Sequence, residues 1–288
     1  MHTAHELTLT STYHPCNQVM HILRGHVADA LALLGTFRLS GSGVHAARQE
    51  IKRARAALRL LRESTDAEHF KQEDTALGQA AQQLNDVRDS EVVLRVFSRL
   101  RDELKGKSPR SNLQPLHRLL LQERRTATAN AAREPLAAGR ALLLQARERT
   151  RDWVVANDLD LLTQAMQRTY RKGRKCYRAA REAATDEHLH AWRRQVKYSA
   201  YQLETLGELA PARMRRRLRR CAQLAKVLGR DHDLLMLSQR AIEADLDDTS
   251  GLRLNRLIKR ERADLQRRAL RLGQRLYRAK PRKFQPLN

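Results

Sequence analysis

Two stretches of the sequence place histidine, arginine and lysine at one shared spacing, H-x-x-R-x-x-x-K. The residues are His45, Arg48, Lys52, His190, Arg193 and Lys197. Arginine offers forked hydrogen bonds to phosphate oxygens, lysine offers a mobile point charge, and histidine becomes charged more readily beside phosphates. Steps of three and four residues put each set on one line of a helix. The spacing therefore predicts two helix faces that bind phosphate or another polyanion.

The first basic line is longer than the second and runs beside an apolar line. Arg55 and Arg59 continue it, whereas Ala200 stands at the position of the second copy that corresponds to Arg55. At about 100° per residue the basic and apolar lines are neighbours on the helix. The apolar line consists of Val44, Ala47, Ile51, Ala54, Leu58 and Leu61. Because no acidic residue falls on the first basic line, binding is favoured over a solvated face, which usually mixes charges.

Further basic side chains are candidates for the same surface. The stretch "TYRKGRKCYRAAR" (169–181) forms a basic line on the helix before the second copy, and we expect it to face that copy across a groove. The stretch "MRRRLRRCAQLAK" (214–226) spreads its charges around a helix, so part of them are solvated. In the last helix, arginines alternate with Glu261 and Asp264, which predicts mainly a surface face. The added binding candidates are Arg24, Arg88, Arg171, Arg174, Arg178, Arg216, Arg220 and Lys226.

The sequence offers little for catalysis or for metal binding. It contains no G-x-x-x-x-G-K-[ST], H-E-x-x-H or G-x-S-x-G pattern, and no carboxylate cluster of the kind that holds Mg²⁺ in phosphoryl transfer. Asp89 and Asp233 lie near predicted helix starts, where capping is a sufficient role. The stretch "RDHD" (230–233) is a weak metal pattern with no distant partner. We therefore predict no catalytic residue, no cofactor and no metal, although a histidine that accepts a phosphoryl group is an alternative.

Composition also indicates a polyanionic partner. The chain of 288 residues has 56 Lys and Arg against 32 Asp and Glu, a formal net charge of +24. Residues 1–150 hold 23 basic and 16 acidic residues and residues 151–288 hold 33 and 16, so the second half carries most of the charge. The three cysteines have no disulfide or zinc-ligand spacing, and no segment reaches the roughly 18 apolar residues of a membrane span. We expect a soluble cytoplasmic protein.

Helical periodicity dominates the chain and repeats itself. The sequence predicts an all-α fold, with helices over 18–39, 44–63, 68–84, 89–104, 113–133, 136–150, 157–183, 187–207, 212–228, 231–245 and 251–279. Leu84 with Asp89 matches Leu228 with Asp233, and each aspartate follows its histidine by a similar interval, 44 and 43 residues. This repetition predicts a lead-in over residues 1–17 and one domain over 18–288, made of duplicated halves at about 18–150 and 151–288.

Six stretches together resemble the CHAD domain, the conserved histidine α-helical domain. They are "VHAARQEIKRARAAL", "LNDVRDSEVV", "TYRKGRKCYRAA", "LHAWRRQVKYSAYQLETL", "LGRDHDLLML" and "LYRAKPRKF". The resemblance implies two similar four-helix bundles about a pseudo-twofold axis, with a basic central cavity or pore that binds inorganic polyphosphate. It implies roles there for His45, Arg48, Lys52, Arg55, His190, Arg193 and Lys197.

The resemblance also implies a non-catalytic targeting or accessory module at polyphosphate granules. Binding of RNA or DNA is the alternative, which the low aromatic content of 4% disfavours because single strands are bound by base stacking. A polyphosphate-processing enzyme and a purely structural scaffold are further alternatives.

Overall fold

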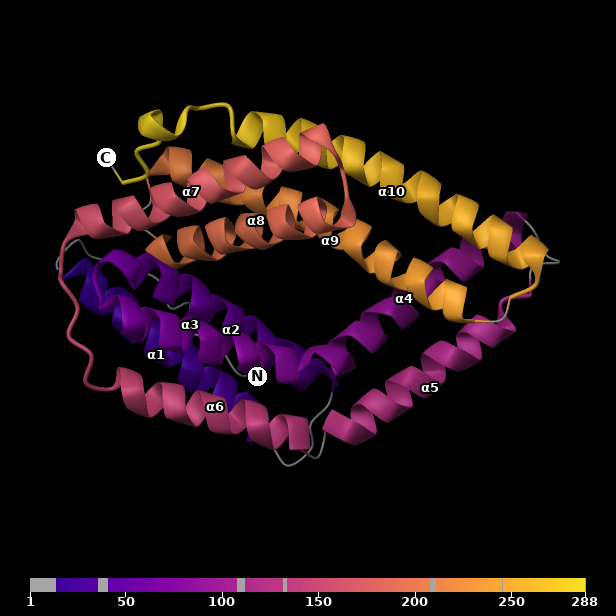
Figure 1. The fold of residues 1–288 in the computed structure, drawn as a ribbon, viewed down its shortest axis with the longest axis horizontal. Helices are drawn as coiled ribbons and strands as arrows, with labels where there is room; N and C mark the ends of the chain where they lie inside the picture. The colour runs from indigo at the N-terminus through magenta and orange to yellow at the C-terminus, as the bar shows by residue number, and fades with distance from the viewer. Residues whose placement is uncertain are drawn as a thin grey trace.

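The computed structural model describes residues 14–35, 41–107, 112–131, 134–207, 211–244 and 246–287, and these ranges hold helices and no strand (Figure 1). The α-helices are α1 (Pro15–Leu34), α2 (Gly41–Leu60), α3 (Ala67–Gln83), α4 (Asn85–Lys107), α5 (Gln114–Ala131), α6 (Glu134–Thr150), α7 (Leu159–Glu182), α8 (Asp186–Leu206), α9 (Ala212–Glu243) and α10 (Asp248–Leu276). Short 3-10 turns follow α2 at η1 (Leu61–Glu63) and α10 at η3 (Pro281–Lys283). The predicted all-α class is confirmed.

Several predicted boundaries differ from the structure, and three of the differences are informative. Residues 212–243 form the single helix α9, although Gly229 and the charged residues after it predict a break. A glycine in a helix interior costs only about 1 kcal/mol relative to alanine, and buried residues on both sides of Gly229 outweigh that cost. Helix α1 begins at Pro15, within the predicted lead-in, and residues 1–13 lie outside the described residues. Helix α2 begins at Gly41, three residues before the predicted start at residue 44.

The helices pack around two hydrophobic cores. The larger core joins α1, α2, α3 and α6 to α7, α8, the first half of α9 and the end of α10. The smaller core joins α4 and α5 to the second half of α9 and the first half of α10. Figure 1 shows α9 and α10 extending from the region of α7 and α8 to the end of the molecule formed by α4 and α5, so both helices take part in both cores.

A buried carboxylate lies on α9 where it passes from one core to the other. Asp231 is 3% exposed and accepts hydrogen bonds from Arg262 Nε at 3.1 Å and Gln266 Nε2 at 3.0 Å. Arg262 also pairs with Asp186 at the start of α8. Because a buried charge is stable only when it is paired, this group ties α8, α9 and α10 together beside the residues that follow Asp231.

Helices α2 and α8 pack against each other and bring the two halves of the chain into contact. Arg53 of α2 lies over the ring of Tyr201 on α8 at 6.0 Å, and Arg59 lies over Tyr198 at 4.3 Å. The two stretches with the repeated spacing therefore lie side by side. Within the described ranges, no helix is both long enough and apolar enough to cross a membrane.

Substitution of two helical glycines by alanine is expected to change the free energy of unfolding in different ways. A Cβ at Gly273 of α10 would lie 2.5 Å from Trp192 Cζ2 and 2.6 Å from Tyr177 Cδ2, whereas a Cβ at Gly229 would meet only Arg193 Nε at 3.9 Å. We expect Gly273→Ala to lower the free energy of unfolding by about 1–3 kcal/mol through overpacking. Gly229→Ala should leave it unchanged or raise it by up to about 1 kcal/mol. Urea denaturation measures both, and equal effects of the two changes would contradict the packing described here.

Candidate functional site

The apolar lines of α2 and α8 are both buried, so they fix the rotation of each helix. In α2, Val44, Ala47, Ile51, Ala54, Leu58 and Leu61 are each no more than 2% exposed. In α8, the corresponding positions Leu189, Trp192, Val196, Ser199, Leu203 and Leu206 are also buried. The basic line is next to the apolar line on each helix, and the two helices are in contact. The local sequence therefore brings both basic lines to the region between the halves.

Five cations from three helices form what we call the central basic cluster. They are Arg48 and Lys52 of α2, Arg88 of α4, and Arg193 and Lys197 of α8. Each of the other four lowers the pKa of Lys52, and Arg193, Arg88 and Arg48 lower that of Lys197, which requires the charges to lie close together. The structure thus brings together five residues that the sequence predicted as binding candidates.

The two lysines of the cluster are held in a strongly unfavourable environment for charge. Burial, followed by Arg48 and Lys197, lowers the pKa of Lys52 from 10.5 to about 6. Burial, followed by Arg193 and Arg88, lowers the pKa of Lys197 from 10.5 to about 7. Burial disfavours the ammonium form and like charges add to the effect. A site with this property gains free energy when a polyanion enters it.

Protein groups fix two of the three arginines of the central basic cluster, Arg48 and Arg88. Arg48 is 6% exposed and donates hydrogen bonds to the carbonyl oxygen of Ala81 at 2.7 Å and to Asn85 Oδ1. Arg88 pairs with Asp89 at 2.8 Å and with Asp233 at 3.6 Å. The guanidinium groups are therefore held in place before any ligand arrives.

Two carboxylates accompany the five cations of the cluster. Burial raises the pKa of Asp233, which lies in the middle of α9, so the predicted capping role is wrong for this residue. The prediction failed because α9 is continuous and offers no free backbone N–H groups there. Asp89 lies in the second turn of α4 and pairs with Arg88. Two carboxylates leave the cluster with an excess of positive charge.

The histidines of the repeated pattern lie at the edges of the cluster. His45 is exposed, and burial together with Arg88 and Lys52 lowers its pKa. The ring of His190 lies 5.3 Å from the ring of His232 on α9. Burial and Arg193 lower the pKa of both His190 and His232, and the pKa of His232 falls to about 4. The imidazoles are thus neutral near pH 7 and add donors or acceptors rather than charge.

The end of the first basic line is already paired inside the protein. Arg55 Nε donates to Asp74 Oδ1 of α3 at 3.1 Å, and Arg59 binds both oxygens of the same carboxylate at 2.8 and 2.7 Å. These two arginines, which the sequence placed with the binding residues, lie away from the central basic cluster and join α2 to α3. Phosphate would have to compete with Asp74 for them.

The remaining candidates lie in other parts of the structure. Arg24 donates two hydrogen bonds to the carbonyl oxygen of Thr150, at 2.9 and 2.5 Å, and so joins α1 to α6. Arg174 and Arg178 line a pocket of about 220 Å³ with Tyr277 and Arg278, so this side of α7 faces α10 rather than α8. Arg171 is exposed, as are Arg216, Arg220 and Lys226 on α9.

Comparison with known proteins agrees with this architecture. The family model of the CHAD domain matches residues 21–242, which is more than half of the chain. This chain belongs to the CHAD family. The crystal structure of the CHAD domain from the plant Ricinus communis is similar over 97% of this chain and 96% of that chain, with a TM-score of 0.64 and 18% sequence identity. At that identity the likeness shows a shared fold, and no curated protein matches the chain.

Two residues of this CHAD protein were missed as binding candidates. Lys172 of α7 is near Arg59 and Arg62, and burial followed by these arginines lowers its pKa. His232 was considered only as a metal ligand, but it lies against His190. Lys172 lies with Arg59 and Arg62, away from the central basic cluster, whereas His232 lies beside His190 at the edge of the cluster. The repeated interval from each histidine to its aspartate could have pointed to His232, because His232 directly precedes Asp233.

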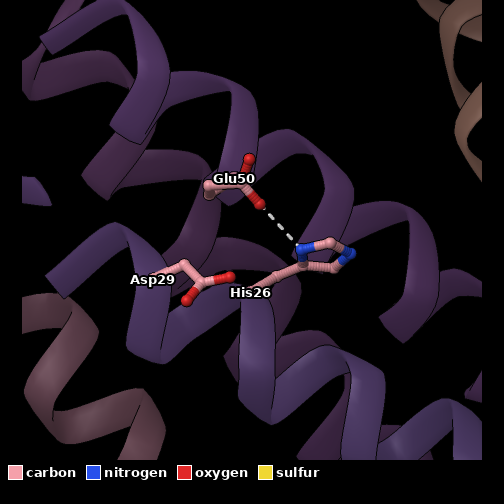
Figure 2. A group of neighbouring side chains, drawn as sticks. All are labelled: His26, Asp29 and Glu50. Carbon is pink, nitrogen blue, oxygen red and sulfur yellow. Dashed lines mark hydrogen bonds and ion pairs between the residues drawn. The ribbon is translucent and has the colours of Figure 1, made fainter. Parts of the chain in front are cut away.

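A separate group on the first half of the CHAD domain has the side chains of a metal site. His26 and Asp29 of α1 and Glu50 of α2 have ligand atoms that all lie within 4.8 Å of one another (Figure 2). Both oxygens of Glu50 are engaged, one by His26 Nδ1 at 2.7 Å and the other by Arg53 at 2.6 Å. This pairing outweighs the effect of burial and lowers the pKa of Glu50. The group therefore joins α1 to α2.

The two lysines predict how stability depends on pH. Their folded-state pKa values of about 6 and 7 lie below the usual 10.5, so between these values the unfolded chain binds more protons. Stability must then rise with pH in this window, by up to about 1.4 kcal/mol per pH unit for each lysine. In the double variant Lys52→Met, Lys197→Met this contribution is absent.

Urea denaturation at pH 7.5 and pH 9 without polyanions measures the difference. We expect the double variant to be more stable than the parent at pH 7.5, with a smaller gap at pH 9. Equal pH dependence of the two proteins would contradict the pKa values of these lysines.

Proposed function

We propose that this CHAD protein binds inorganic polyphosphate, without catalysis, through the central basic cluster. The observation that carries the proposal is the pair Lys52 and Lys197, two half-buried lysines from the two halves of the chain whose pKa values are lowered by burial and by neighbouring cations. Such perturbed groups concentrate at functional sites. A chain of phosphates supplies the negative charge that the surrounding protein lacks.

The electrostatics favour a ligand with many closely spaced charges. A single phosphate would face five basic side chains, of which only Arg88 has close carboxylate partners among the described contacts of the cluster. A linear polyanion contacts the arginines and lysines of both helices at once, and each charge-assisted hydrogen bond contributes about 1.5–3 kcal/mol. Linking several such contacts in one chain raises the affinity far above that of any one contact.

The placement of the cluster supports a groove or pore between the two halves. Its residues come from α2 and α4 before the midpoint of the chain and from α8 after it. The repeated pattern positions His45 beside the cations of α2 and His190 beside those of α8. We propose that the halves, about 18–150 and 151–288, are similar bundles about an approximate twofold axis. A polyphosphate chain would then pass between them from one histidine to the other.

Binding of nucleic acid is less well supported by the same residues. Proteins that bind single strands stack bases on aromatic rings. The rings that lie near α2 and α8 are already covered, because Arg59 lies over Tyr198 at 4.3 Å and Tyr177 packs on Trp192 at 5.3 Å. Arginine and lysine side chains alone recognise phosphate without bases. We therefore propose a targeting or accessory role toward polyphosphate, including at polyphosphate granules in the cytoplasm.

Replacing the two lysines tests the proposal. Lys52→Met with Lys197→Met keeps side-chain length and removes both ammonium groups, so we expect affinity for polyphosphate of about one hundred residues to fall at least about 100-fold. The matched control is Lys71→Met with Lys259→Met, which makes the same replacement at two exposed lysines. Isothermal titration calorimetry at two salt concentrations gives both affinities, and the control should stay within about threefold of the parent.

Three outcomes would contradict the proposed function. Equal losses in both double variants would show that binding follows net charge rather than the central basic cluster. A single-stranded RNA that displaces polyphosphate at equal phosphate concentration would favour nucleic acid as the ligand. Phosphate release in the presence of Mg²⁺ would contradict the non-catalytic role.

A further inference from the structure

A second basic pocket lies at the end of α10, outside the central basic cluster. It has a volume of about 640 Å³, and eight of its lining residues are arginine or lysine. Helix α9 contributes Arg213, Arg217 and Arg220, and the segment after α10 contributes Lys280, Arg282 and Lys283. Most of its lining lies beyond residue 242, where the match to the CHAD family model ends.

The floor of this C-terminal pocket is built around one fixed arginine. The guanidinium of Arg217 lies over the rings of Tyr170 at 4.7 Å and Phe284 at 4.8 Å. It also donates a hydrogen bond to the carbonyl oxygen of Leu276 at 2.9 Å. That bond uses one of the five N–H groups of the side chain. Arg217 is therefore held before a ligand binds, which reduces the entropy lost on binding.

The rim of the pocket is a turn whose backbone is also fixed. Phe284 is buried, and its ring stacks on Tyr170 with the ring centroids 4.3 Å apart. The backbone N–H groups of Lys283 and Phe284 donate to the carbonyl oxygens of Lys280 and Pro281, which closes the 3-10 turn η3. Lys280, Arg282 and Lys283 are exposed on this turn. The fold thus anchors a turn that concentrates three cations at the mouth of the pocket.

Charge is balanced differently in the middle and at the end of α10. In the middle of the helix, Glu261 binds Arg99 of α4 at 2.7 Å, and Arg262 pairs with Asp186 and Asp231. At the C-terminal pocket, the described lining residues include no aspartate or glutamate. The sequence predicted mainly a surface face for this helix, but its last arginine, Arg275, lines the pocket, as does Arg278 just beyond the helix end. A concentration of like charge in a concave site requires an anion to balance it.

An aromatic core separates this pocket from the central basic cluster. Trp192, on the buried line of α8, packs on Tyr177, which packs on Tyr277 at 5.7 Å between ring centroids. Tyr277 packs in turn on Tyr170, the ring that lies under Arg217. The cluster residues Arg193 and Lys197 lie on the other line of α8. The two basic sites are therefore distinct, and one short ligand does not reach both.

We propose that the C-terminal pocket is a second phosphate-binding site, which holds a short run of phosphate groups from inorganic polyphosphate. The inference rests on the proposed function for the identity of the ligand. A volume of about 640 Å³ lies within the roughly 300–1,000 Å³ of small-ligand pockets, and so it accepts a few phosphates rather than a long chain. With a site on either side of the aromatic core, one protein holds two polyphosphate segments at once.

Tripolyphosphate is the probe that tests this site, used with the full chain and isothermal titration calorimetry. The parent should bind two tripolyphosphate ions. Lys280→Ala, Arg282→Ala and Lys283→Ala together should weaken one of the two binding events at least tenfold. The matched control, Arg256→Ala, Lys259→Ala and Arg260→Ala, removes the same charge from exposed positions near the start of α10 and should keep both events. Circular dichroism confirms that each variant is folded.

The double variant Lys52→Met, Lys197→Met separates this inference from the proposed function. It should lose the other binding event and keep the one that the C-terminal substitutions remove. If only the C-terminal variant retains both events, the second site is wrong and the central basic cluster stands. If only the lysine variant retains both, the proposed function is wrong. Binding of only one tripolyphosphate per parent chain would also overturn the second site. So would a C-terminal variant that loses binding of a short RNA but keeps both tripolyphosphate binding events.

Discussion

Two neighbouring lysines, whose charge is opposed by burial and by nearby cations, constrain the arrangement of the rest of this structure. Lys52 and Lys197 come from halves of the chain that are far apart in sequence, and each stands where burial and neighbouring cations oppose its charge. The fold does not let either side chain turn away, because the adjacent apolar line of each helix is buried in the larger core. The cost of bringing these charges together is met by the hydrophobic burial of α2 and α8.

The surrounding residues hold this arrangement without cancelling it. Asn85 and the carbonyl of Ala81 hold Arg48, while Asp89 and Asp233 hold Arg88, so the guanidinium groups are ordered. Arginines that are not needed at the cluster are paired elsewhere, as Arg55 and Arg59 are with Asp74. Order without neutralisation is the property expected of a site prepared for a polyanion. The C-terminal pocket shows the same combination, with Arg217 fixed by rings and its neighbouring cations unopposed by lining acids.

The sequence was informative where one helix determined the answer. Each buried line and its adjacent basic line follow from spacing alone, and the repeat indicated that two such helices act as a pair. Contacts between distant segments were not accessible in this way. The pairing of Arg55 and Arg59 with Asp74 depends on how α3 packs on α2, and the orientation of Arg174 depends on Tyr277, to whose carbonyl oxygen it donates at 3.2 Å. The continuity of α9 was not predicted, because a glycine such as Gly229 favours a helix break. In the structure, buried residues on both sides of Gly229 keep the helix continuous.

We predict that the paired lysines lose charge in the free protein and regain it when a polyanion binds. Nuclear magnetic resonance of ¹³C-labelled lysine side chains measures this directly, with assignment from Lys52→Met and Lys197→Met. We predict midpoints near pH 6 for Lys52 and near pH 7 for Lys197 in the free protein. Saturating polyphosphate should move both midpoints above about pH 9, because anions stabilise the ammonium form. Midpoints near 10 in the free protein, or midpoints that polyphosphate leaves unchanged, would contradict the account.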